Sequence, residues 1–329
     1  PAAAGAPFNF LPFARARRRL RLPMTSSAQS RAWFAAIAAM LLALFFWAII
    51  PLFLEHFTHL LDPWTVNAAR YFFTAAFWLP FVVHSLRRIA PAGRRAVWKA
   101  ALVPAAAHTV CQIFYGFAPY YNNATMLNFG CRLSIPFTTL FGFWLLKSER
   151  PLARSPLFWT GLLCAVGGFL LMFEKGFGTD GTSPAGMALL LGFAVTWGVY
   201  VVFVRRNLSG IPPHLSYGLI SLLAFPPLLA LMLALGEWHA LLALPWNQWL
   251  WLILSALIGL ALSHMLFYRA ILVMGPIASE GGMLLIPFQT ALLAHFALGE
   301  RLSATQWLAG GIMIAGCALL LRARFAARE

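Results

Sequence analysis

Two stretches of the chain, IPFTTLFGFWLLKSERP at 135–151 and IPFQTALLAHFALGERL at 286–302, decide its fold. They align at an offset of 151 residues, and each joins a proline-containing apolar run to a Glu-Arg pair. Three other matches keep an offset of 150: Trp47-Ala48 with Trp197-Gly198, Pro63 with Pro213, and Gly161-x-x-x-Ala165 with Gly311-x-x-x-Ala315. The shared spacing indicates two copies of one structural unit.

The composition around these repeats requires a lipid environment. Apolar residues make up 61% of the 329 residues and charged residues only 10%, whereas soluble domains carry about 25% charged residues. A membrane helix needs about 20 mostly apolar residues. Ten such runs predict an all-α polytopic membrane protein, with spans at 32–54, 64–84, 99–119, 125–147, 156–173, 184–204, 214–235, 248–268, 277–298 and 303–321.

The distribution of charge predicts the orientation. All lysines and arginines except Arg70, Arg132, Lys175 and Arg301 fall in the tails or loops that share one side of the membrane. Most acids fall on the other side: Glu55, Asp62, Glu174, Asp180, Glu237 and Glu300. The positive-inside rule then places both termini in the cytoplasm. The same bias accounts for the net charge of +15 without a nucleic-acid partner.

Five spans in each repeat, an odd number, make the second repeat enter the membrane inverted relative to the first. We expect repeat 1 at 31–174 and repeat 2 at 181–322, with a basic, disordered tail at 1–30 and a cytoplasmic tail at 323–329. Inverted repeats are typical of secondary transporters. A scaffold or a pore with the same repeats is the alternative.

The basic tail contains ARARRRLRL at 14–22. An Arg-rich transit peptide, a disordered tail facing anionic lipid and an extension upstream of a start at Met24 all fit it, and these alternatives stay open.

Several of these motifs resemble the EamA-type drug/metabolite transporter superfamily over roughly residues 32–321. The resemblance is carried by Trp197-Gly198, by Arg70 in the second span, by the glycine-rich fifth and tenth spans, and by the Pro136 and Pro287 helices that end in Glu149-Arg150 and Glu300-Arg301. It implies a ten-helix carrier, in many members a bacterial inner-membrane exporter of amino acids or related metabolites. It also implies a central cavity between helices one to four and six to nine. Two positions depart from the pattern: Ala48 replaces the first-repeat glycine, and Ile220 gives no charge opposite Arg70.

Two arginines lie inside the predicted spans. Arg132 is four residues outward of Pro136, roughly 6 Å into the outer half, and Arg70 reaches a similar depth. A charge near the bilayer centre costs about 2.5–3.5 kcal/mol on insertion scales. Recognition of a carboxylate or phosphate would explain both side chains. Alternatively, Arg70 could reach Asp62 or Glu55, and Arg132 could bind helix carbonyls freed by Pro136.

Glu280 is the only acid inside a predicted span, and His264 on the eighth span reaches a similar depth in the inner half. Facing one another, the two could exchange a proton or form an inner gate. Alternatively, Glu280 could simply stabilise the helix dipole near the start of its helix. Gly275-Pro276 and Gly281-Gly282 flank Glu280 and would let this end move.

Other polar and aromatic side chains reach mid-membrane. His108, Gln112 and Tyr115 lie near the middle of the third span, and Trp47 and Trp197 lie just either side of the midplane. We consider all five candidate substrate-binding residues, with packing as the alternative.

No nucleotide-binding, metalloprotease or nucleophile-elbow motif occurs in the sequence. Glu55, His56 and His59 are a weak signal for a metal, and we predict no metal, no cofactor and no enzymatic activity. The favoured hypothesis is a secondary carrier exporting zwitterionic metabolites such as amino acids, with protons as one candidate coupling ion and a homodimer as one candidate assembly. A carrier of phosphorylated or nucleotide-like solutes is the first alternative, and a passive channel or lipid scramblase is the second.

Overall fold

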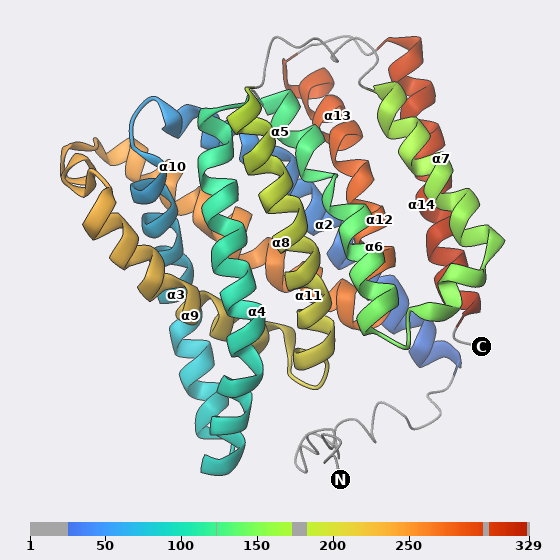
Figure 1. The fold of residues 1–329 in the computed structure, drawn as a ribbon, viewed down its shortest axis with the longest axis horizontal. Coiled ribbons are helices and arrows are strands. Elements are labelled where there is room, and N and C mark those ends of the chain that lie inside the picture. The colour runs from blue at the N-terminus through green and yellow to red at the C-terminus, as the bar shows by residue number, and fades with distance from the viewer. Residues whose placement is uncertain (1–25, 123, 173–182, 299–302, 328–329) are drawn as a thin grey trace.

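The computed structural model describes residues 26–122, 124–172, 183–298 and 303–327, and the regular elements in these ranges are all helices (Figure 1). Seven of the ten predicted spans are continuous. They are α2 (Ser26–Thr58), α3 (Pro63–Arg87), α4 (Pro91–Phe117), α7 (Pro156–Met172), α8 (Pro184–Leu208), α9 (Pro213–Leu235) and α14 (Ala304–Ala326). Short helical turns η1 (Ala118–Tyr120), η2 (Arg150–Arg154) and η3 (Trp238–Ala243) lie in the connections.

The other three spans are interrupted. The fourth consists of α5 (Ala124–Cys131) and α6 (Ser134–Leu145). The eighth consists of α10 (Trp246–Ala256), the π-helical turn η4 (Leu257–Leu262) and α11 (Ser263–Met274). The ninth consists of α12 (Pro276–Gly282), η5 (Met283–Leu285) and α13 (Ile286–Leu298). All ten predicted spans therefore correspond to helices, and the all-α prediction is confirmed.

The breaks in spans four and nine are equivalent in the two repeats. Arg132 and Met283 are separated by the same 151 residues as the two quoted stretches. Each precedes a proline by four residues, Pro136 and Pro287, and a proline has no N–H to donate to the carbonyl four residues earlier. One sequence feature therefore opens both helices at the same depth.

Length and composition single out the segments that could cross a membrane as one described helix. Seven helical segments qualify, among them the interrupted eighth span Trp246–Met274, whereas Ser134–Leu145 and Pro156–Leu171 are apolar but shorter. Since α6 is short, we infer that it crosses together with α5.

Some sequence assignments lie at or beyond the described ranges. Helix α2 begins at Ser26, inside the segment assigned to the basic tail, and α14 continues to Ala326, inside the segment assigned to the C-terminal tail. Residues 1–25, and Glu174, Lys175, Asp180, Glu300 and Arg301 among the predicted exterior residues, lie outside the described residues.

Prolines and capping side chains set several helix starts. α3, α4, α7, α8, α9 and α12 all begin with proline, whose fixed φ and missing N–H suit the first helical position. Asp62 caps α3, because its Oδ1 accepts hydrogen bonds from the N–H groups of Trp64 at 2.9 Å and Thr65 at 3.1 Å. Its Oδ2 accepts from the N–H of Glu237 at 2.9 Å, which ties the turn between α2 and α3 to the segment after α9.

Helix packing follows the symmetry of the inverted repeats. α4 of span three packs on α8 of span six, and α11 of span eight packs on α2 of span one, which is the same contact with the repeats exchanged. The contacts of α6 with α8 and of α13 with α2 are related in the same way. The equivalent helices α3 and α9 pack on each other, as do α7 and α14.

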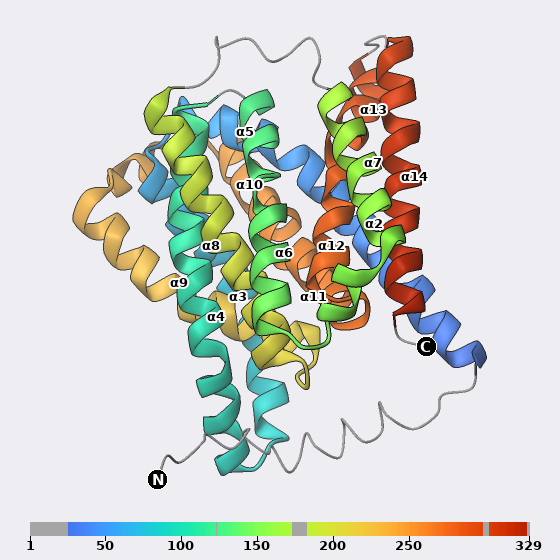
Figure 2. The ribbon, with the colours of Figure 1, turned by 45° about the vertical axis from the view of Figure 1, so that its right-hand side comes forward.

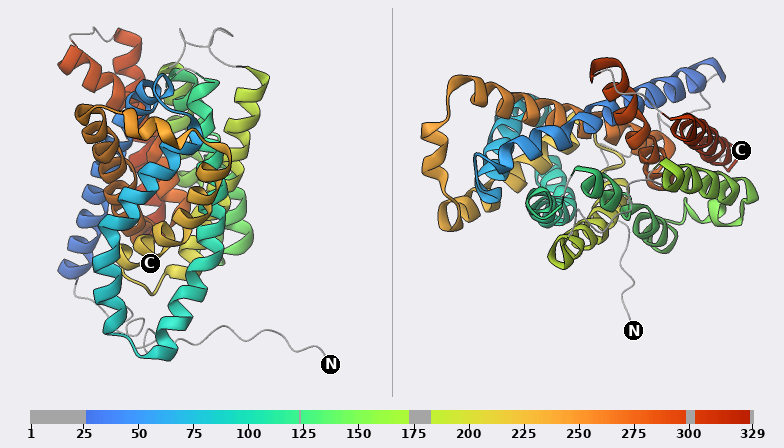
Figure 3. Two further views of the ribbon diagram at one scale, coloured as in Figure 1. Left: turned by 90° about the vertical axis from the view of Figure 1, so that its left-hand side faces the viewer. Right: turned by 90° about the horizontal axis from the view of Figure 1, so that it is seen from above.

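α7 and α14 form a peripheral pair at one edge of the bundle (Figures 2 and 3). A Cβ at Gly161 would lie 2.9 Å from the Leu319 Cβ, and a Cβ at Gly316 would overlap the backbone N of Ala165. Gly161 and Ala165 therefore pack α7 against α14. Gly311 and Ala315 take no part in this contact: both are exposed, and no described atom lies within 4 Å of a Cβ at Gly311, because α14 turns Gly316 toward α7 instead.

The loops after α3, α6 and α8 and the end of α14 lie at the same end of the bundle (Figure 1). A buried ion pair that the sequence did not reveal joins two of them. Arg324 Nη2 on α14 lies 2.8 Å from Glu149 Oε1 in the α6–α7 loop, and Arg324 Nη1 donates to the Ser148 carbonyl at 3.1 Å. Both side chains pack on Gly275, whose φ of +90° turns the chain from α11 into α12.

Candidate functional site

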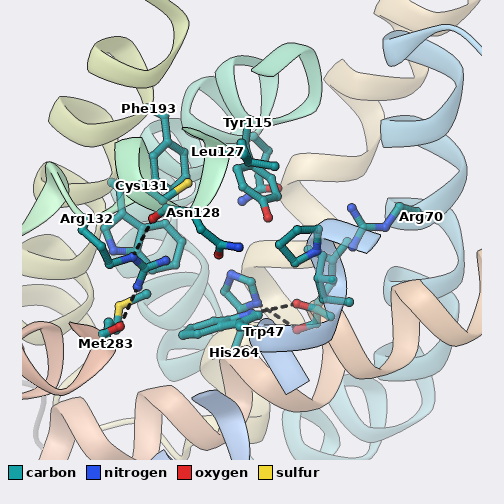
Figure 4. Close-up of a pocket in the computed structure, with 16 residues that line it drawn as sticks. Trp47, Arg70, Tyr115, Leu127, Asn128, Cys131, Arg132, Phe193, His264 and Met283 are labelled. Atoms are coloured by element: carbon teal, nitrogen blue, oxygen red, sulfur yellow. Dashed lines mark hydrogen bonds between the residues drawn. The ribbon is translucent and has the colours of Figure 1, made fainter. Parts of the chain in front are cut away.

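A cavity of about 50 Å³ lies in the middle of the bundle (Figure 4). Its walls come from spans one to four, six, eight and nine. Seven of the nine predicted site residues line it: Trp47, Arg70, Gln112, Tyr115, Arg132, Trp197 and His264. One water needs roughly 10–15 Å³ of such space, so the cavity holds a few waters and must widen to accept a metabolite.

Arg132 lies at the break between α5 and α6 and is 9% exposed. Its Nη1 donates to the Met283 carbonyl at 3.1 Å, and its Nε donates to the Asn128 carbonyl at 3.3 Å. The Met283 carbonyl belongs to the equivalent break of the other repeat, where Pro287 supplies no α-helical N–H and the carbonyl accepts instead from the Ile286 N–H that ends η5. Arg132 therefore binds one carbonyl that a proline deprives of its α-helical donor, as the alternative interpretation proposed, but that proline is Pro287 and not Pro136.

Arg70 lies across the cavity from Arg132 (Figure 4) and is 2% exposed. Its Nη2 donates at 3.3 Å to the carbonyl of Ser255, which lies in α10 two residues before η4 begins. The proposed pairing of Arg70 with Asp62 or Glu55 is wrong, since Asp62 caps α3 and binds the Glu237 N–H. Among the described residues, neither Arg70 nor Arg132 has a carboxylate oxygen within 4.0 Å.

Trp47 and Trp197 meet edge to face with ring centroids 5.8 Å apart. Trp47 Nε1 donates to the Gly259 carbonyl at 3.0 Å, within the π-helical turn. Trp197 is stacked with Phe193 at 5.5 Å. The following residue, Gly198, lets α8 approach α6, since a Cβ there would lie 2.9 Å from the N of Thr138.

Gln112 and Tyr115 both line the cavity from α4. The Gln112 carbonyl accepts from Asn67 Nδ2 at 2.8 Å, and Tyr115 packs on Phe193 with centroids 5.3 Å apart. The sequence did not single out Asn128, Cys131 or Phe193, which line the same wall. Asn128 and Cys131 could have been predicted as cavity residues, because both lie within one helical turn of Arg132.

Glu280 is fully buried behind the cavity wall, on α12. Its Oε1 accepts from Trp197 Nε1 at 2.8 Å, and its Oε2 accepts from Ser134 Oγ at 3.0 Å. The carboxylate thus links α12 to α8 and to the start of α6.

His264 does not meet Glu280, so the prediction that the two face each other is wrong. Trp197 lies between them: it donates to Glu280, and its ring centroid is 5.8 Å from that of His264. The His264 ring stacks on Tyr217 at 4.7 Å and approaches His108 at 5.2 Å. His108 lies outside the cavity wall, fully buried, with its Nε2 at 2.6 Å from Tyr71 Oη.

Glu55, His56 and His59, which were considered for a metal, do not gather into a ligand set in the described part of the chain. His56 Nε2 lies 2.7 Å from Gln248 Oε1. In the part of the chain that the structure describes, no group of three or more His, Cys, Asp or Glu side chains is arranged to hold a metal.

Comparison with known proteins relates this architecture to one family. A search of curated proteins gives no match. A solved crystal structure superposes with a TM-score of 0.67 at 17% sequence identity, covering 91% of this chain and 99% of the other, which shows a shared fold. The model of the EamA-like transporter family matches residues 34–174 and again residues 184–322, one match for each repeat. The chain therefore belongs to the EamA-like transporter family, within the drug/metabolite transporter superfamily.

Proposed function

We propose that the chain exports small carboxylate-bearing metabolites, zwitterions such as amino acids in the first place, by alternating access. The observation that carries this proposal is the pair of buried arginines on one cavity, neither of which has a carboxylate within 4.0 Å among the described residues. Two guanidinium groups in a low dielectric attract an anionic group strongly. The polar remainder of the wall and its indole rings would contact the rest of a small metabolite.

Arg132 is the main recognition residue in this proposal. Its Nε and Nη1 are held by carbonyls from both repeats, and the remaining donors of the fork are left for a substrate oxygen. Because the Met283 carbonyl belongs to the other repeat, the position of the Arg132 guanidinium, and with it the substrate affinity, would depend on how the two repeats sit relative to each other. Arg70, bound to Ser255 on span eight, supplies the second positive charge.

Glu280 is the proposed gate residue. It belongs to α12, a seven-residue helix between the Gly275 turn and the break at η5. Its carboxylate holds α12 against Ser134 and Trp197. Releasing these two bonds would let α12 leave the bundle and open the cavity toward the end where the cationic loops lie. By the positive-inside rule we assign that end, with both termini, to the cytoplasmic side of the inner membrane.

A carrier of phosphorylated solutes is the second candidate, because both arginines line one cavity and a dianion would use both charges. A thermal-shift screen of the purified protein separates the candidates, since a ligand that binds the folded state raises its apparent stability. The panel contains amino acids, hydroxy acids, sugar phosphates and neutral polar metabolites.

The screen is repeated with Arg132→Ala, Arg132→Lys and the control Arg206→Ala, whose arginine is exposed over the Phe203 ring. Stabilisation by carboxylates that is lost in Arg132→Ala, weakened in Arg132→Lys and kept in Arg206→Ala supports the proposal. Stabilisation by sugar phosphates alone favours the second candidate. Stabilisation by neutral compounds alone contradicts both.

A further inference from the structure

His264 sits at the boundary between the cavity and a buried cluster of aromatic and titratable side chains. It lines the cavity together with Arg70 and Arg132. On its other side Tyr217 of α9 stacks on its ring at 4.7 Å, and His108 of α4 lies edge-on at 5.2 Å. Trp47 of α2 and Trp197 of α8 complete its surroundings at 5.2 Å and 5.8 Å. His264 is 2% exposed.

The hydrogen bond of His264 fixes its tautomer. Nδ1 lies 3.1 Å from the Leu260 carbonyl, and a carbonyl only accepts, so we assign the proton of the neutral ring to Nδ1. Nε2 is then a bare lone pair. It is buried and has no hydrogen-bond partner among the described residues. A buried polar atom left in this state needs an explanation, such as a ligand that arrives during function.

The charges around His264 determine when Nε2 can accept a proton. Arg70 of α3 and Arg132 at the α5–α6 break share its cavity, and two positive charges oppose a third nearby. The titratable neighbours Tyr217 and His108 carry no negative charge when protonated as usual. Glu280 of α12 is engaged by Ser134 and Trp197, so it does not neutralise the cavity through direct contact with His264.

We propose that His264 Nε2 takes up a proton when an anionic substrate group binds between Arg70 and Arg132, so that proton and substrate occupy the carrier together. The inference rests on the proposed function of the cavity. One N–H bond forms on Nε2 as an O–H bond of a hydronium ion from the solvent breaks and leaves water, and the bound anion offsets the arginine charges that oppose the imidazolium. Linkage makes the effect reciprocal: the anion promotes protonation, and protonation promotes anion binding. Export then runs down the substrate's own gradient and carries a proton outward.

The test is to count protons by titration calorimetry on the full chain in lipid nanodiscs. L-lactate and L-alanine serve as probes, in buffers of different ionisation enthalpy and at several pH values. The wild type is expected to take up protons on binding, with affinity rising by up to about tenfold for each unit of pH decrease, the limit for one linked proton. Proton release, or binding without uptake, overturns the inference and leaves the proposed function intact. Failure of both probes to bind overturns the proposed carboxylate recognition, and the inference with it.

Two variants locate the proton. His264→Asn keeps a donor in place of Nδ1 and removes Nε2, so proton uptake and the pH dependence of affinity should disappear while binding at high pH remains. Tyr217→Phe keeps the stacked ring and should retain uptake. Undiminished uptake by His264→Asn contradicts the assignment.

If His264→Asn does not fold, ¹⁵N-histidine labelling of the wild type gives a second readout. One ring should convert from the Nδ1–H tautomer to the doubly protonated form when lactate is added. No change in any ring on binding of lactate would overturn the inference.

Discussion

The ion pair between Arg324 and Glu149 makes a testable contribution to stability. Glu149 is fully buried and the Arg324 side chain is 3% exposed. Arg324→Met removes the partner of Glu149 Oε1 and the donor to the Ser148 carbonyl. Removing one member of a buried ion pair costs about 3–5 kcal/mol. We expect a loss of this size in the free energy of unfolding.

The double variant Glu149→Gln/Arg324→Met should recover most of that loss, because it leaves no buried charge. Arg322→Met is the matched control, since Arg322 lies two residues earlier on α14 and is exposed. The free energies are measured by titrating detergent micelles with a denaturing detergent and following tryptophan fluorescence. If Arg324→Met unfolds like Arg322→Met, or if the double variant is less stable than Arg324→Met, the structural reasoning is refuted.

Three other predictions follow from the packing and the gate. Gly275→Ala should destabilise the protein by more than about 1 kcal/mol in the same unfolding titration, because φ is +90° there and a Cβ would lie 2.7 Å from Arg324 Nη2; stability equal to wild type would contradict the turn. Gly316→Leu should disrupt the α7–α14 pair and lower thermal stability, whereas Gly311→Leu should leave the monomer unchanged; the reverse order would show that α14 packs by its other face. Glu280→Ala should keep ligand binding but make the Cys131 thiol more reactive, because the proposed release of α12 opens the cavity that Cys131 lines. Cys131 is 5% exposed, and its labelling by a thiol reagent is read by mass spectrometry. Unchanged labelling would argue against the gate.

The sequence predicted the spans and their grouping well for physical reasons. A membrane helix is defined by the length of an apolar run, so ten runs located ten helices without knowledge of their contacts. Counting residues along each span estimated depth, which put Arg70 and Arg132 at one level in the outer half and Trp47 and Trp197 just either side of the midplane. The structure places all four on one cavity.

Contacts between spans could not be obtained in this way, because depth says nothing about which faces meet. Glu280 and His264 have similar depth, yet Trp197 separates them. Gly311 carries the small-residue pattern, yet α14 uses Gly316 to meet α7. The pairing of Glu149 with Arg324 joins segments 175 residues apart. The partner of Arg132 could have been considered from the sequence, because Pro287 removes the α-helical donor of the Met283 carbonyl four residues earlier. Pro287, however, lies in the opposite repeat from Arg132.

Recognition of a carboxylate by the buried arginines is tested most directly by counterflow in proteoliposomes, with a carboxylate metabolite that stabilises the purified protein. Saturable accumulation of labelled compound is expected for the wild type and for Arg206→Ala, and none for Arg132→Ala, which should remain folded because its cavity can rehydrate. Accumulation by Arg132→Ala at the wild-type rate would contradict the recognition role of the arginine pair. Flux that does not saturate and shows no counterflow would show instead a passive channel.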